Sequence, residues 1–231
     1  MPRTDRVDIG DEIYHVLNRA NGRLGIFATD PDYRLFEALL KEAKELTDMR
    51  ILAYTIMPNH WHLVLYPRKD GDLAVFMHWL TLTHTRRYHS IHKTVGHGHL
   101  YQGRYKSFLV DKDDYLRTLI RYVERNPLRA RMVDRAEDWQ WGSAWRRLKG
   151  SPKEKKLIAQ PPTELPRRYA SWLNDDEDDD TLTQLRNSVN KGTPYGTMEW
   201  TEDIIEQYDL QSTVRGTGRP KKHIRPQNYV K

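Results

Sequence analysis

The chain contains no cysteine among its 231 residues. This absence excludes disulfide bonds, iron–sulfur clusters and zinc sites built on cysteine. No stretch approaches the roughly 20 apolar residues that span a bilayer. The first ten residues, Met1 to Gly10, are charged and hold no apolar run, so no signal peptide is expected. These absences together predict a soluble cytoplasmic protein without membrane contact.

What the sequence does contain is charge. Charged residues make up 30% of the chain, and the formal net charge is +6. An excess of positive charge favours an anionic partner such as nucleic acid. Hydrophobic residues still reach 38% and aromatic residues 10%, which is enough for a packed core. The length suits one domain with an extension, or two small domains.

Hydrophobic periodicity predicts the order strand, helix, strand, strand, helix, strand. The strands are expected at Glu12–Asn18, Ile51–Met57, His60–Tyr66 and Tyr105–Val110, and the helices at 30–46, with Asp30 as N-cap, and at Asp72–His92. A third helix over Asp111–Arg125 is expected to stop at Asn126-Pro127. This order is that of the split βαβ, ferredoxin-like arrangement, an α+β fold with an antiparallel sheet.

The pattern weakens after Val133. The remaining features are a short helix over Trp139–Leu148, a linker over Ser151–Pro166, an acidic run over Asn174–Asp180, one or two small helices over Thr181–Leu210 and a basic tail over Arg215–Lys231. The acidic run is interpreted as a solvated loop or the start of a helix. We therefore predict a domain over residues 1–149 and a helical or irregular C-terminal extension over 150–231.

A pair of histidines, His60 and His62, begins the third predicted strand. Side chains alternate along a strand, so both histidines face one side while Trp61 faces the other. Two imidazoles about 7 Å apart on one strand face can hold one divalent metal ion. By itself, His-x-His on a strand more commonly reflects chance or surface placement.

The third predicted helix carries Tyr122 and Asn126, which are four residues apart and therefore share a face. If this face lies over the histidine strand, Asn126 can be a third metal ligand beside His60 and His62. Such an N/N/O site suits Mg²⁺ or Mn²⁺ acting on a phosphate. Tyr122 would then be a nucleophile that attacks phosphorus. Because a free phenol has a pKa near 10, the Tyr122 hydroxyl would need help to lose its proton.

Two internal competitors exist for these roles. His97 and His99 form a second His-x-His, but they lie among glycines in a predicted loop that fixes neither backbone nor rotamer. Tyr115 lies seven residues before Tyr122 on nearly the same helix face, and its i+4 neighbour is Leu119, which cannot bind a metal. Tyr122 is therefore preferred, and Tyr115 remains an alternative.

Four segments together resemble one known family. They are Met57–Leu65 (MPNHWHLVL), Tyr101–Ser107 (YQGRYKS), Tyr115-Leu116 and Arg121–Ala130 (RYVERNPLRA). The set resembles the REP-associated tyrosine transposases, which belong to the single-tyrosine HUH transposases of bacterial insertion sequences. The similarity runs in order from about Tyr14 to Trp145, and the segment beyond Gly150 matches no motif of the family.

The resemblance implies a ferredoxin-like HUH endonuclease fold and metal-dependent nicking of single-stranded DNA. It implies that His60, His62 and Asn126 bind Mg²⁺ or Mn²⁺, and that Tyr122 forms a 5′-phosphotyrosine and leaves a 3′-OH. It implies that the substrate is an imperfect palindrome folded as a REP-like hairpin, with a short single-stranded flank. It leaves a monomer or a homodimer open, and it implies a nucleoid-associated protein.

Candidate DNA contacts are the cationic and aromatic residues near the motifs. They are Arg86, Arg87, Arg104, Tyr105 and Lys106. Cations would meet phosphates, and Tyr105 would stack on bases of the flank. Arg219, within Gly218-Arg219-Pro220, resembles an AT-hook core that enters a narrow minor groove, although a basic tail adding non-specific affinity is the plainer interpretation.

Three other functions fit parts of the sequence. The first is a domesticated hairpin-binding protein that keeps the fold without catalysis. The second is a hydrolytic metal-dependent nuclease in which water attacks and Tyr122 is structural. The third is RNA binding through the sheet, although the expected aromatic RNP pattern is absent from the strands.

Overall fold

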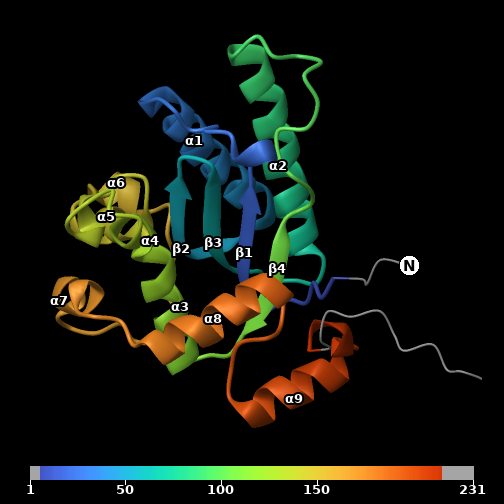
Figure 1. Cartoon of the computed structure of the whole chain (residues 1–231), viewed down its shortest axis with the longest axis vertical. Helices are drawn as coiled ribbons and strands as arrows, with labels where there is room; N and C mark the ends of the chain where they lie inside the picture. Colours follow the sequence, from blue (N-terminus) through green and yellow to red (C-terminus); the bar gives the residue numbers. More distant parts are fainter. Residues whose placement is uncertain (1–5, 215–231) are drawn as a thin grey trace, which may run out of the picture.

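The computed structural model describes residues 6–214 and has one antiparallel sheet at its centre (Figure 1). The strands are β1 Ile13–Arg19, β2 Arg50–Met57, β3 His60–Tyr66 and β4 Lys106–Val110. Their order is β2-β3-β1-β4, with every neighbouring pair antiparallel. The predicted ferredoxin-like arrangement is therefore confirmed, and it places β3 in the interior of the sheet.

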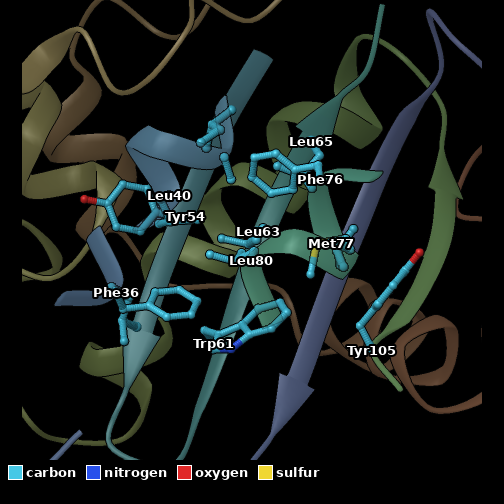
Figure 2. Close-up of a cluster of buried hydrophobic side chains, with 14 of the residues drawn as sticks. Phe36, Leu40, Tyr54, Trp61, Leu63, Leu65, Phe76, Met77, Leu80 and Tyr105 are labelled. Carbon is cyan, nitrogen blue, oxygen red and sulfur yellow. The ribbon is translucent and has the colours of Figure 1, made fainter. Parts of the chain in front are cut away.

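Two long helices, α1 Asp30–Thr47 and α2 Asp72–Ile91, cover one face of this sheet. Trp61, Leu63 and Leu65 point from β3 into the core beneath them (Figure 2). This pattern agrees with the predicted alternation, in which Trp61 faces away from the histidines. The N-cap of α1 is Thr29 and not Asp30 as predicted, because Thr29 forms a capping box that closes the first turn.

Helix α3, Asp114–Glu124, covers the opposite face (Figure 1). It buries an apolar stripe that includes Leu119, Ile120 and Val123 against β2 and β3. The helix ends at Glu124, before Asn126-Pro127, as predicted. A further single turn, α4 Asn126–Arg129, follows Arg125 directly, because proline is tolerated in the first turn of a helix.

The rest of the described chain forms short helices. They are α5 Ser143–Leu148, α6 Pro152–Lys155, α7 Tyr169–Asn174, α8 Asp179–Lys191 and α9 Met198–Gln207, with 3₁₀ turns at Asn21–Arg23, Ala136–Asp138 and Gln211–Thr213. The two helices α8 and α9 confirm the prediction for Thr181–Leu210. No helix within 6–214 combines the length and apolar character needed to cross a membrane.

The C-terminal extension packs along both edges of the sheet. The amide of Ala159 donates to the carbonyl of Ile51 on β2 over 2.8 Å. At the other edge, Tyr195 donates to Leu109 over 2.9 Å and accepts from Asp111 over 2.8 Å. These bonds pair backbone groups that an exposed edge would leave open. The interpretation of Ser151–Pro166 as a linker is therefore wrong, since part of this segment is hydrogen-bonded to β2.

Candidate active site

The two histidines of β3 follow a tight turn from β2, in which Met57 pairs with His60. Both rings lie on the face of the sheet that α3 covers, with His62 against Tyr122. Their ring centroids are 5.2 Å apart and their planes are nearly perpendicular. Metal–nitrogen bonds of about 2.1 Å allow two ring centres on one ion to lie at most about 6.5 Å apart. The spacing of the pair therefore fits a shared ion.

Neighbouring residues occupy the Nδ1 atom of each histidine. His60 Nδ1 lies 2.6 Å from Asn59 Oδ1, and the Asn59 amide nitrogen donates to the carbonyl of Arg23 over 3.3 Å. Because an amide oxygen only accepts, His60 carries its proton on Nδ1 and keeps a lone pair on Nε2. His62 Nδ1 lies 2.9 Å from Nε2 of His15. In both rings Nε2 is therefore the atom left for a ligand.

Burial also keeps the two imidazoles uncharged. It lowers the pKa of His60 to about 4, with the Arg19 guanidinium adding to the effect. It holds the pKa of His62 well below its usual range, and the neighbouring His15 and His60 add to this. A neutral imidazole is the form that binds a metal ion. Residues 6–214 contain no cluster of three or more His, Asp or Glu side chains placed to hold an ion.

Tyr122 lies on the buried face of α3, and the residue is 8% exposed. Its ring meets those of His62 and His15 edge-on, at centroid distances of 6.1 and 6.4 Å. Burial raises the pKa of the Tyr122 phenol, and the Arg129 and Arg186 guanidinium groups oppose that rise. The phenol is thus near the histidine pair but is protonated at neutral pH unless it receives help.

The alternative tyrosine, Tyr115, lies elsewhere on α3. Its ring packs edge-on against Tyr195 of the extension, at a centroid distance of 5.1 Å. The two alternative histidines, His97 and His99, are exposed in the loop between α2 and β4. The geometry therefore groups Tyr122 with His60 and His62.

Asn126 begins α4, one turn beyond Tyr122. Its amide nitrogen donates to the carbonyls of Tyr122 and Val123 over 3.1 and 3.2 Å. The amide oxygen, Oδ1, takes no part in these two bonds. The Val123 carbonyl also accepts from Thr55 Oγ1 over 2.8 Å, and Thr55 pairs with His62 across β2 and β3. One carbonyl thus links the turn that carries Asn126 to the strand position beside His62.

The acidic run packs on the end of the tyrosine helix. Glu177 forms ion pairs of 2.9 Å with both Arg125 and Arg129, and its side chain is only 10% exposed. Arg129 in turn lies over the ring of Tyr122. The interpretation of the run as a solvated loop is wrong at Glu177, because this carboxylate is largely buried against the guanidinium groups of Arg125 and Arg129. The run does end in a helix start, where Asp178 caps α8.

The predicted DNA contacts differ in their exposure. Arg86, Arg104 and Lys106 are exposed, while Arg87 is exposed but forms a two-bond ion pair with Glu42. Tyr105 is 9% exposed. Tyr105 was predicted to stack on bases. In the structure the guanidinium carbon of Arg6 lies over its ring, 4.0 Å from the ring centroid. Arg219 lies outside the described residues.

A cleft of about 810 Å³ runs between α2 and the loop that precedes β4. Arg104 and Tyr105 line it, together with His78, Thr85 and Gln102. It brings two of the predicted DNA contacts onto one concave surface.

Sequence reasoning missed three residues of this site, namely His15, Arg129 and Glu177. His15 lies within the predicted first strand, and alternation along that strand could have placed it on the histidine face. Arg129 follows Tyr122 by seven residues, which puts it near the same helix face. Glu177 gave no local signal, because its partners lie about 50 residues earlier in the chain.

The chain thus combines a ferredoxin-like sheet with a His-x-His strand under a tyrosine-bearing helix, and its sequence matches the model of one transposase family. The family model described as "Transposase IS200 like" matches residues 10–126, which is half of the chain. The chain therefore belongs to the IS200-like transposase family, and the predicted membership of an insertion-sequence transposase family is confirmed. A search of curated proteins finds no match.

One solved structure shares the fold, and a second matches more weakly. A REP-associated tyrosine transposase bound to a REP hairpin matches with a TM-score of 0.54 at 16% identity, covering 67% of this chain and 90% of that one. A putative transposase from Deinococcus radiodurans R1 matches with a TM-score of 0.39 at 18% identity, covering 57% of this chain and 92% of that one. The first similarity confirms the predicted fold class.

Proposed function

We propose that this transposase is of the REP-associated type and cleaves and joins single-stranded DNA at REP-like hairpins through a 5′-phosphotyrosine intermediate. One observation carries the proposal: Tyr122 lies against His62 within a single chain, beside two imidazoles whose Nε2 atoms are left open. The hairpin bound by the structurally similar transposase supports the choice of substrate.

In the proposed cleavage, the Tyr122 hydroxyl oxygen attacks the phosphorus of one phosphodiester. The bond from phosphorus to the 3′ oxygen breaks, and the proton lost by the phenol is balanced by protonation of the departing 3′ oxygen. The 5′ phosphate stays on Tyr122, so the bond energy is kept for rejoining to a 3′-OH. The positive charge of Arg129 over the ring faces the phenolate that develops as the oxygen loses its proton.

The proposed cofactor is a divalent metal ion, Mg²⁺ or Mn²⁺, held by Nε2 of His60 and His62 and by the Oδ1 of Asn126. The donor set fits this assignment because both imidazoles are neutral and the Asn126 amide nitrogen is engaged elsewhere. When bound, such an ion neutralises charge on the scissile phosphate and helps the leaving oxygen depart. Mn²⁺ is the better match to imidazole ligands.

The proposed DNA surface combines the exposed cations Arg86, Arg104 and Lys106 with the cleft beside α2. Lysine and arginine side chains would bind phosphates of the hairpin. The cleft between α2 and the loop before β4 would take the single-stranded flank. Stacking on Tyr105 would require Arg6 to leave the ring face. DNA as the partner would place the protein at the nucleoid.

We also propose a division of the chain into a transposase domain over 1–149 and an extension over 150–231, whose Glu177 holds the end of the tyrosine helix. Because one chain supplies both histidines and Tyr122, cleavage would not need a second subunit. A monomer is then sufficient for chemistry, whether or not the protein dimerises.

The test uses hairpin oligonucleotides from the DNA that flanks this gene, labelled at the 3′ end, with Mn²⁺ or Mg²⁺. A denaturing protein gel should show a labelled protein–DNA adduct that Tyr122→Phe abolishes and the matched control Tyr115→Phe retains. Cleavage without an attached label would instead identify a hydrolytic nuclease. Binding of a cognate hairpin with neither product would identify a domesticated binding protein.

A further inference from the structure

A third histidine, His15 on β1, is completely buried beside His62. In the β1–β3 ladder His62 pairs with Leu17, and His15 lies two residues away on the same face. Its Nε2 atom is 2.9 Å from His62 Nδ1, and the two ring planes differ by only 7°. This contact joins two strands and involves a histidine for which no role has been assigned above.

The two rings lie edge to edge in one plane. Their centroids are 5.1 Å apart, while the two nitrogens are 2.9 Å apart. Each ring nitrogen lies about 1.1 Å from its ring centre, so the two centres and the two nitrogens fall nearly on one line, the geometry of a strong hydrogen bond. The contact is therefore a directed N–H···N bond rather than a face-to-face stack.

The direction of this bond decides whether His62 can bind a cation. A neutral imidazole carries one proton. If His62 donates from Nδ1, its Nε2 keeps a lone pair that can bind a cation. If His15 donates from Nε2, the proton of His62 must be on its own Nε2, and no lone pair is left there.

The two histidines of β3 differ in how firmly this choice is made. For His60 the acceptor is the amide oxygen of Asn59, which cannot donate. For His62 the partner is the imidazole of His15, which can either donate or accept the hydrogen bond. Within residues 6–214, the remaining nitrogen of His15, Nδ1, is buried without a hydrogen-bond partner, so no neighbour there fixes the tautomer of His15. His15 lies edge-on to Phe108 instead.

We propose that His15 is a positioning residue that accepts the Nδ1 proton of His62 and thereby turns the Nε2 lone pair of His62 toward a divalent cation. The inference rests on the proposed metal site at His60 and His62. In this arrangement the proton of His15 resides on Nδ1, which is buried without a hydrogen-bond partner among residues 6–214. A bound cation at Nε2 of His62 favours the arrangement in which His62 donates to His15.

The first measurement is a titration with Mn²⁺ in the absence of DNA. The electron paramagnetic resonance signal of the free ion reports how much Mn²⁺ is bound. His15→Phe keeps a buried ring but removes the acceptor, and we expect its affinity for Mn²⁺ to fall roughly 10- to 100-fold. His15→Gln offers an amide oxygen as acceptor and should recover part of the affinity. His84→Phe, a matched change of a buried histidine on the opposite face of the sheet, should bind as the wild type does.

The second measurement needs no variant and reads the tautomer directly. In ¹⁵N-labelled wild-type protein saturated with Mg²⁺, ring-nitrogen spectra should show His62 protonated at Nδ1 and unprotonated at Nε2. A proton on Nε2 under these conditions would overturn the proposal, and so would wild-type Mn²⁺ affinity in a folded His15→Phe protein.

Failure of the metal site itself gives a different result. If the wild type binds no Mn²⁺, or if His60→Ala binds it as tightly as the wild type, the proposed metal site and the role of His15 fall together. If His60→Ala loses binding while His15→Phe does not, only the role of His15 is overturned.

Discussion

The guanidinium carbon of Arg129 lies 4.3 Å from the ring centroid of Tyr122. The same arginine donates to the Tyr122 carbonyl and to both carboxylate oxygens of Glu177. A cation held this firmly over a buried phenol stabilises negative charge on that phenol. Arg129, on the turn α4 that follows the tyrosine helix, therefore supports the candidate nucleophile. Glu177 of the extension in turn holds Arg129 in place.

Replacing Arg129 tests this support. Arg129→Ala removes the cation beside the phenolate that develops during attack, so we expect adduct formation to slow roughly tenfold, the value of about 1.4 kcal/mol in a barrier. Arg129→Lys keeps the charge but not the planar group, so its rate of adduct formation should lie between those of the wild type and Arg129→Ala. Single-turnover adduct formation on a labelled hairpin measures the rate. An Arg129→Ala rate equal to that of the wild type would show that the cation is not used in catalysis.

Glu177 is predicted to hold the extension on the tyrosine helix. Glu177→Gln leaves Arg125 and Arg129 without their shared carboxylate, and we expect the free energy of unfolding to fall by about 3 kcal/mol, as when one partner of a buried ion pair is removed. Denaturant unfolding measures this loss. The matched control is Asp176→Asn, whose side chain is exposed and should cost little. Equal stability of the two variants would contradict the structural role of Glu177.

Thr55 is predicted to position the end of α3 over β3. Thr55→Val keeps the shape of the side chain but removes the hydroxyl that donates to the Val123 carbonyl, leaving that buried carbonyl with one bond fewer. We expect a loss of about 1 kcal/mol in unfolding free energy and slower adduct formation, whereas Thr55→Ser should retain both. Chemical denaturation and the adduct gel give the two readouts. An unimpaired Thr55→Val would show that the bond does not hold the helix end.

The buried histidine of the opposite face predicts how stability depends on pH. Burial lowers the pKa of His84 to about 3 from an ordinary 6.5, with Asp32 opposing the shift. Below pH 6.5 the unfolded chain binds a proton that the folded chain binds only near pH 3, so stability is complete above pH 6.5 and is lost as the pH falls. Each such group contributes a slope of about 1.4 kcal/mol per pH unit in this window.

His84→Gln provides the check on this slope. The variant lacks the titrating group, so its unfolding free energy should fall less steeply between pH 6.5 and pH 3 than that of the wild type. Its stability at pH 8 serves as the reference, because the lost hydrogen bond to Tyr101 lowers stability at every pH. Parallel pH profiles for the two proteins would rule out a neutral, buried His84.

Salt dependence tests the DNA surface. If Arg86 and Arg104 bind phosphates, hairpin affinity should fall steeply with salt, and Arg86→Ala or Arg104→Ala should each reduce the magnitude of the log–log slope by about one. Arg34→Ala is the control, because Arg34 is an exposed cation on α1 that pairs with Asp30. Titrations at several salt concentrations give the slopes. The surface would be assigned wrongly if all three variants kept the wild-type slope.

Local pattern was enough to predict the elements and one half of the candidate site. Alternation along a strand placed His60 and His62 on one face and Trp61 on the other, and the structure confirms this arrangement. Helical spacing put Tyr122 and Asn126 one turn apart, and the order of elements gave the sheet. These features depend on residues within a few positions of one another, so the sequence by itself contains them.

Tertiary structure alone decided how the site is completed. His15 meets His62 across 47 residues, and Glu177 meets Arg129 across 48. Nothing in the local sequence sets such contacts, because they follow from which strands pair and where the extension packs. The acidic run was interpreted as solvated for the same reason. Its charge pattern does not reveal that Arg125 and Arg129 pack against Glu177. Spacing along the chain determined which side chains share a face, and packing determined which faces meet.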